Sequence, residues 1–170
     1  LKEMQISRFT VDLPGAFSLK GGGILENLTD SLTRSGTIGL DMVTRNLNFL
    51  TGLTGVTPDG SLVIPDSMSL KMKMEMNGPQ YKAKLDLKEG KGSMNVNAAL
   101  NSSTEVYTAD LKINDLQLHH FLPKDSIYEL SLSADAKGRG LDVMSFHSLA
   151  NLNLSLDQLH YARYHLSNVH

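Results

Sequence analysis

The clearest pattern in the chain is a strict alternation of apolar and polar residues. In the segment 67–76, every second residue is Met or Leu, and the residues between them are Ser, Lys or Glu. Successive side chains of a β-strand point to opposite faces, whereas a helix would spread these residues around its circumference. The pattern therefore predicts a strand with one apolar face and one polar face.

The same alternation recurs along most of the chain, and the alternating segments are separated by short stretches rich in Gly, Asn, Pro and Ser. Stretches such as Asn77-Gly78-Pro79 and Glu89-Gly90-Lys91-Gly92 are typical of tight turns. Short turns join strands that run in opposite directions. We therefore expect about nine to eleven strands in antiparallel order.

In two places the alternation changes phase within one predicted strand. The apolar positions run to Ile113, shift at Asn114-Asp115, and continue with Leu116. A second shift precedes Leu159. One extra residue in a strand produces such a change of phase, so each site predicts a β-bulge.

Helical patterns are rare. Residues 24–34 contain leucines at helical spacing, but the preceding glycines 21–23 could continue a strand, and we favour a strand followed by a loop. Residues 47–53, after Asn46 as a candidate N-cap, predict one short helix. The expected fold is mostly β: a curved antiparallel sheet forming a hydrophobic groove, with at most one or two short helices, as a single segment over residues 1–170.

Composition narrows the function classes. The 170 residues contain no Cys and no Trp, and their net charge is -2 with the basic residues scattered. Disulfides, thiolate metal sites and a Cys nucleophile are excluded, and nucleic acid is not an expected partner. No stretch reaches the roughly 18 consecutive apolar residues of a membrane-spanning helix.

The residue patterns of common enzyme sites are not found. His160, His165 and His170 fall five positions apart, which fits neither a helix face nor a strand face, and the adjacent pair His119-His120 would point to opposite faces if extended. The glycine clusters lack the residues of a phosphate-binding loop. We therefore expect no enzyme activity, no cofactor and no metal site.

The methionine stripe of segment 67–76 allows two interpretations. It could pack against a second sheet as a plain core, or its flexible side chains could line a surface that accommodates acyl chains of varying shape. Aromatic residues make up only 6% of the chain, which favours an open trough over a filled sandwich core. The expected groove residues are Met68, Leu70, Met72, Met74, Met76, Tyr81, Leu85, Leu87, Met94, Val96, Leu100, Leu111, Ile113, Leu130, Leu132, Leu152 and Leu154.

Three segments carry a resemblance to a known family. The segments 35–51, 85–92 and 118–128 resemble the TamB family of bacterial translocation and assembly module proteins, which belongs to the wider AsmA-like group. The resemblance covers roughly Phe9 to His170. It implies a β-taco-like groove in a periplasmic section of a long protein that is anchored in the inner membrane.

The resemblance also implies a function. Members of this family are associated with moving phospholipid toward the outer membrane and with an Omp85-type barrel partner, which would bind through other regions. The expectation is a section of a lipid conduit for outer-membrane biogenesis, whose partner is a phospholipid or another acyl-chain lipid. Two alternatives stay open: an assembly module that pairs an edge strand with outer-membrane barrel proteins, and a plain β-sandwich binding domain.

Overall fold

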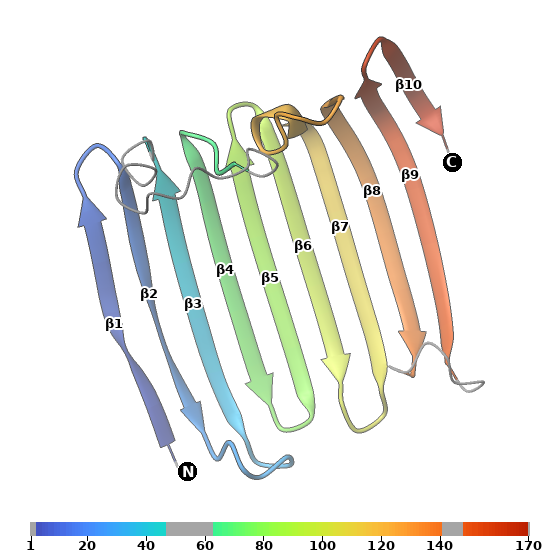
Figure 1. Ribbon diagram of the computed structural model, residues 1–170. Helices are drawn as coiled ribbons and strands as arrows, with labels where there is room; N and C mark the ends of the chain where they lie inside the picture. The colour runs from blue at the N-terminus through green and yellow to red at the C-terminus, as the bar shows by residue number, and fades with distance from the viewer. Residues whose placement is uncertain (1–2, 47–62, 141–147, 170) are drawn as a thin grey trace.

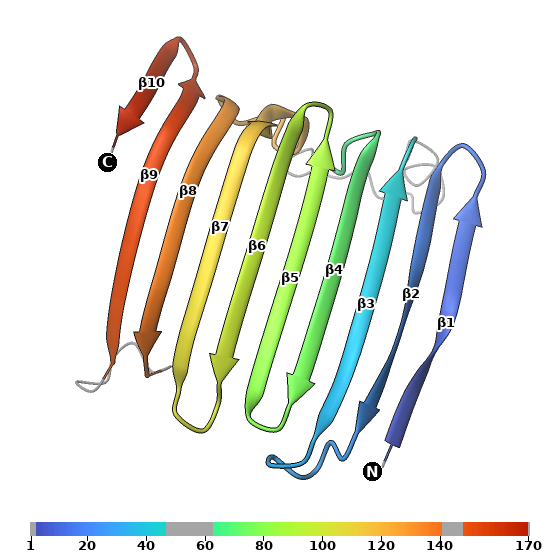
Figure 2. The ribbon, with the colours of Figure 1, turned by 180° about the vertical axis from the view of Figure 1, so that it is seen from behind.

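The chain forms one open, curved antiparallel sheet of ten strands, each hydrogen-bonded to its neighbours in sequence order (Figures 1 and 2). The computed structural model describes residues 3–46, 63–140 and 148–169. The strands are β1 (Glu3–Leu13), β2 (Phe17–Glu26), β3 (Ser35–Thr44), β4 (Met68–Asn77), β5 (Gln80–Glu89), β6 (Gly92–Asn101), β7 (Val106–Gln117), β8 (Ile127–Arg139), β9 (Leu149–Tyr161) and β10 (Tyr164–Val169). The expected mostly-β, antiparallel fold is confirmed.

The predicted turns connect the strands as expected. Gly78 and Pro79 join β4 to β5, and Gly90 and Lys91 join β5 to β6. Gly78 and Gly90 have φ angles of 53° and 55°, in the left-handed region that glycine enters without a steric cost. The turn glycines therefore set the hairpins, and the alternating segments between them supply the strands.

Both predicted bulges are present. Between β7 and β8 the pairing shifts after Ile113, and Asp115 takes a φ of 47°. Ser131 on β8 holds this bulge, because its hydroxyl accepts a hydrogen bond from the Asp115 N–H at 2.8 Å and donates one to the Asp115 carboxylate at 3.2 Å. The second shift lies between β8 and β9, where Leu132 pairs with Leu156 and Ser131 with Gln158.

The helical predictions have different outcomes. Residues 24–34 form the end of β2 followed by turns, as favoured. The short helix expected at residues 47–53 lies outside the described residues. The structure adds a 3-10 turn, η1 (Leu118–His120), which leads from β7 into the β7–β8 connection. No helix in the described ranges has the length and apolar character needed to cross a membrane.

The sheet is a single layer over the described residues, so the β-sandwich alternative is wrong. The accessible surface is 11479 Å², whereas a compact monomer of this size would expose about 8,200 Å². A single layer lacks a second sheet to cover its apolar side, which agrees with the larger surface. The buried hydrophobic cluster is correspondingly small and consists of Met68, Leu87, Ile113 and Leu116.

Candidate functional site

One side of the sheet is apolar from β1 to β9, and we call it the apolar face. Residues paired across neighbouring antiparallel strands point to the same side, so the register defines rows of side chains. One row runs through Phe9, Gly21, Leu40, Met72, Leu85, Val96, Leu111, Ala134 and Leu154. The next row runs through Val11, Leu19, Met42, Leu70, Leu87, Met94, Ile113, Leu132 and Leu156. Neither row contains a polar side chain.

All of the predicted groove residues lie on this face, which follows from the pairing of each strand with its neighbours. Their exposure differs with position. Met68, Leu87 and Ile113 are buried, while Met74, Leu152 and Leu154 are exposed. The buried residues lie in the rows nearest the β7–β8 connection, whereas Met74, Leu152 and Leu154 lie in rows further from it.

A row of alanines crosses the middle of the apolar face. Ala83, Ala98, Ala109 and Ala136 are paired in succession on β5 to β8. Longer side chains flank the row on both sides on β5, β6 and β7, so the surface is lower along the alanines of these strands. The predicted set omitted these residues because an alanine in an alternating strand gives no signal by itself, and only the register places several of them side by side.

Two aromatic residues lie over glycines of a neighbouring strand, one pair on β1 and β2 and the other on β7 and β8. A Cβ on Gly21 would lie 2.6 Å from the Phe9 ring, and one on Gly138 would lie 2.5 Å from the Tyr107 hydroxyl. Each ring therefore covers the backbone of the paired strand where a side chain is missing. Mid-strand glycines 21–23 thus serve close packing, consistent with the expectation that they do not form a phosphate-binding loop.

The apolar face is covered at one end. The residues Leu118–Phe121, which we call the cap segment, follow β7 at the end of the sheet where β8 begins (Figure 1). Leu118 and Phe121 pack against the buried cluster of Met68, Leu87, Ile113 and Leu116, which we call the covered end. The cap segment is the second layer that the rest of the described face lacks.

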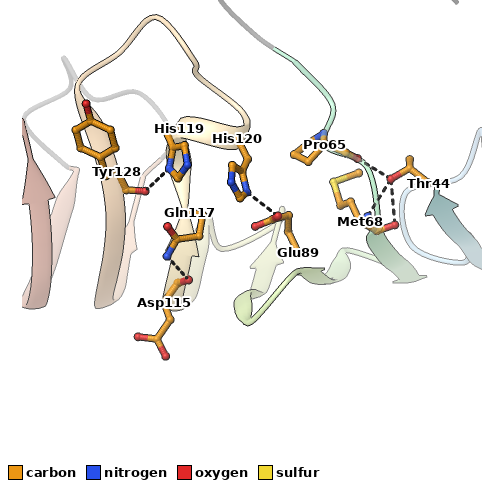
Figure 3. Close-up of polar contacts among 9 residues, drawn as sticks. All are labelled: Thr44, Pro65, Met68, Glu89, Asp115, Gln117, His119, His120 and Tyr128. Atoms are coloured by element: carbon orange, nitrogen blue, oxygen red, sulfur yellow. Dashed lines mark hydrogen bonds and ion pairs between the residues drawn. The ribbon is translucent and has the colours of Figure 1, made fainter. Parts of the chain in front are cut away.

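A carboxylate interrupts the apolar face at the covered end. Glu89 shares the parity of Leu85 and Leu87 on β5, and its side chain is only 6% exposed. One carboxylate oxygen accepts a hydrogen bond at 2.8 Å from Nδ1 of His120 in the cap segment (Figure 3). Sequence analysis missed this pair, although the parity of Leu85 and Leu87 was a signal that placed Glu89 on the apolar side.

A buried threonine fixes the chain that enters β4. Thr44 is fully buried at the end of β3. Its hydroxyl donates to the Pro65 carbonyl at 2.8 Å and accepts from the Met68 N–H at 3.0 Å (Figure 3). These bonds hold Met68 in the covered end.

The opposite side of the sheet is charged. Lys73 and Glu75 form an ion pair of 2.5 Å, and Asp86 and Asp135 accept hydrogen bonds from Asn95 and Asn153 across neighbouring strands. The hydrogen bond and the charge of Lys73 lower the pKa of Glu75 below its ordinary value. A shallow hollow of about 350 Å³ on this side is lined by residues such as Lys73, Lys82, Lys84 and Asp110. The sheet as a whole is thus amphipathic.

The histidines lie closer together than the sequence predicted. His119 and His120 are in η1 and not in an extended strand, so the condition for opposite faces is not met, and their ring centroids are 4.1 Å apart. The β9–β10 hairpin stacks His160 on His165 at 3.9 Å, which the spacing of five concealed. Within the described ranges, no three metal-ligating side chains are placed to hold an ion together.

The chain was compared with protein-family models, curated proteins and solved structures, and none of them matches it. The resemblance to the TamB family and the periplasmic location that it implies therefore stay predictions. The function has to be argued from the amphipathic sheet itself.

Proposed function

We propose that the apolar face binds the acyl chains of lipids and guides them across the strands, as a section of a lipid conduit. The observation that carries the proposal is the series of apolar rows from β1 to β9, interrupted by Glu89 at the covered end, with the other charged residues of β4 to β8 collected on the opposite side. No bond is made or broken in this role. The resemblance to the TamB family suggests phospholipid as the cargo and the periplasm as the setting.

The extent of the apolar face supports a binding role. Ten strands spaced about 4.8 Å apart and about ten residues long form a sheet of roughly 43 by 33 Å. The largest apolar patch on an ordinary monomer is about 300–600 Å². A face of this size, which the described residues leave open outside the covered end, is expected to have an occupant.

The residue types favour a flexible occupant over a rigid one. Met, Leu and Ala dominate the rows that cross β4 to β8, and the unbranched methionines can adjust to different shapes. Full burial of a methylene contributes about 0.8 kcal/mol, and an open face that covers one side of the chain contributes roughly half of that. Because the rows are uniform along the sheet, a bound acyl chain can shift by one strand without losing many contacts.

The proposal is tested by two double variants, each of which introduces two aspartates on one face of the sheet. The variant Met72→Asp/Met74→Asp places two charges in the apolar rows, whereas the matched control Ser69→Asp/Thr108→Asp places two on the charged side. We expect the first variant to lose co-purifying phospholipid, measured by mass spectrometry, and to bind a fluorescent fatty acid at least about tenfold more weakly. The control should match the wild type.

Equal lipid in both variants would overturn the proposal. So would a wild-type protein that is lipid-free and dimeric by light scattering but becomes monomeric in the Met72→Asp/Met74→Asp variant, because the occupant would then be a second copy of the chain. Circular dichroism checks that both variants keep the sheet.

A second candidate function, strand pairing with a partner protein, is favoured by the edge at β9. Strand β10 pairs with β9 only from Leu156 to Tyr161, and among the described residues nothing pairs with the outer side of 149–155. Free strand edges can accept an added strand. Asn151→Pro should abolish binding of an outer-membrane barrel protein and leave fatty-acid binding intact, while Asn151→Ala should change neither. Barrel binding that survives in Asn151→Pro would exclude this edge.

A further inference from the structure

The buried carboxylate of Glu89 has an incomplete set of partners. Its Oε1 atom accepts the hydrogen bond from His120, while its Oε2 atom is buried and has no hydrogen-bond partner in the described part of the chain. Burying a carboxylate is costly unless it is paired with a positive charge or fully hydrogen-bonded. The state of His120 therefore decides how well this burial is compensated.

His120 belongs to the cap segment, so its contact with Glu89 depends on where the cap segment lies. The backbone N–H groups of Phe121 and Leu122 donate to the Leu118 carbonyl at 2.9 and 2.8 Å, and the Val63 N–H donates to the Phe121 carbonyl at 2.7 Å. The His120 side chain is 44% exposed, so it can exchange protons with the solvent while the cap segment is closed. If the cap segment lifts, His120 leaves Glu89 and the covered end loses Leu118 and Phe121.

We propose that the His120–Glu89 pair is a proton-dependent latch that holds the cap segment on the apolar face. In the neutral tautomer that carries the proton on Nδ1, the imidazole donates an ordinary hydrogen bond to Glu89. The imidazolium donates the same bond as an ion pair, which is stronger. Histidine changes its charge between about pH 5 and 8. The closed cap segment is therefore more stable near pH 6 than near pH 8.

The charged and titratable neighbours set the size of the effect. The His119 ring lies 4.1 Å from the His120 ring and 5.6 Å from Tyr128 of β8, so a proton on His119 opposes one on His120. Lys88 and Lys91 flank Glu89 along the chain on β5 and the following turn, Asp115 lies on β7 (Figure 3), and Asp66, Lys124 and Asp125 lie in the loops before β4 and after η1. Glu89 is the carboxylate in direct contact with His120. Its attraction to a protonated His120 therefore decides that the closed cap segment is more stable at lower pH.

The latch has a consequence for lipid that rests on the proposed function. When the cap segment is closed, Met68, Leu87 and Ile113 are covered, so the open part of the apolar face stops short of the edge where β7 ends and β8 begins. When it opens, these residues extend the apolar face to that edge. Acidic conditions would thus make this end less accessible to acyl chains than neutral or alkaline conditions, in which the cap segment opens more often.

Hydrogen exchange measures the latch without any lipid. We expect the amides of Phe121 and Leu122, corrected for intrinsic exchange, to be protected about fivefold more at pH 6 than at pH 8, as the gain from a charge-assisted bond implies. Glu89→Gln and His120→Gln should each remove this difference. His119→Gln is the matched control and should keep it or increase it.

The latch would be overturned by equal protection at the two pH values in the wild type, or by a pH difference that survives in either Glu89→Gln or His120→Gln. Central β5 amides, such as that of Leu85, should keep their protection in every variant, which separates opening of the cap segment from unfolding. Because the measurement contains no lipid, a failed latch leaves the acyl-chain proposal standing, and a failed lipid assay leaves the latch standing.

Discussion

Leu116 and Leu154 lie on the same face of the same sheet, yet Leu116 is 3% exposed and Leu154 is 56% exposed. Both belong to alternating strands, and the sequence pattern around them is alike. The difference comes from the cap segment, which packs on the covered end around Leu116, whereas Leu154 is not among the residues packed against that cluster. The comparison shows that alternation decides which side a residue faces, while a second layer decides whether it is buried.

The largest predicted effect is the difference in the free energy of unfolding between alanine substitutions of these two leucines. Leu116→Ala leaves a cavity beneath the cap segment and should lower the free energy of unfolding by about 2–4 kcal/mol. Leu154→Ala removes a side chain that is mostly in water and should cost less than about 1 kcal/mol. Urea unfolding followed by circular dichroism measures both. Equal losses would mean that the covered end is not a core.

Thr44→Val tests how firmly the covered end is tied to the chain before β4. The substitution keeps the shape of the side chain but leaves the buried Met68 N–H without its acceptor. We expect a loss of about 1–3 kcal/mol in the free energy of unfolding. Thr44→Ser retains the hydroxyl and should recover most of it. If valine is tolerated, the hydrogen bonds of Thr44 are not what holds Met68.

Two glycines extend the comparison to the backbone. A Cβ on Gly92, at the covered end, would lie 2.7 Å from the Leu116 Cα atom, whereas one on Gly39 would meet nothing within 4 Å. Gly92→Ala should destabilise the protein by about 1–3 kcal/mol because the bulge must move. Gly39→Ala should stabilise it by about 0.4–1 kcal/mol, since alanine restricts the unfolded chain. Thermal unfolding would show shifts of opposite sign.

The smallest effect concerns Asp30, an exposed group between β2 and β3. Hydrogen bonds from the Leu32 N–H and the Thr33 hydroxyl lower the pKa of Asp30 below its ordinary value of 3.8. A lowered pKa means that these bonds stabilise the fold above about pH 4 and are lost as the pH falls through the folded-state value. An NMR titration should show the lowered pKa, and Thr33→Ala should raise it. If the pKa of Asp30 is the same in Thr33→Ala as in the wild type, the Thr33 hydroxyl is not a cause of the lowered pKa.

The sequence predicted the parts of the fold that depend on neighbouring residues. Alternation placed Met72 and Leu85 on one face, and the phase change at Asn114-Asp115 located a bulge that the structure contains. The phase of alternation was a reliable guide because an antiparallel hairpin with a short turn allows little choice of register.

The sequence did not predict features that depend on how separate strands are aligned. The stacking of His160 on His165 and the packing of Tyr107 over Gly138 need a cross-strand register that no single segment contains. The burial of Glu89 needs the cap segment, which comes from a loop about thirty residues later. The candidate site was therefore predicted as a face, but its cover and its one carboxylate were not.

The order of the strands has a consequence for how such a sheet forms and changes. Each strand pairs only with the strands before and after it in the chain. Apart from the β3–β4 connection of residues 45–67, these pairings close short connections, which favours rapid folding by successive hairpins. Stability is then approximately a sum of terms between adjacent strands, as in solenoid proteins. A hairpin could be added or removed at β1 or β10 without repacking the strands in between, which gives evolution a simple way to adjust the length of the apolar face.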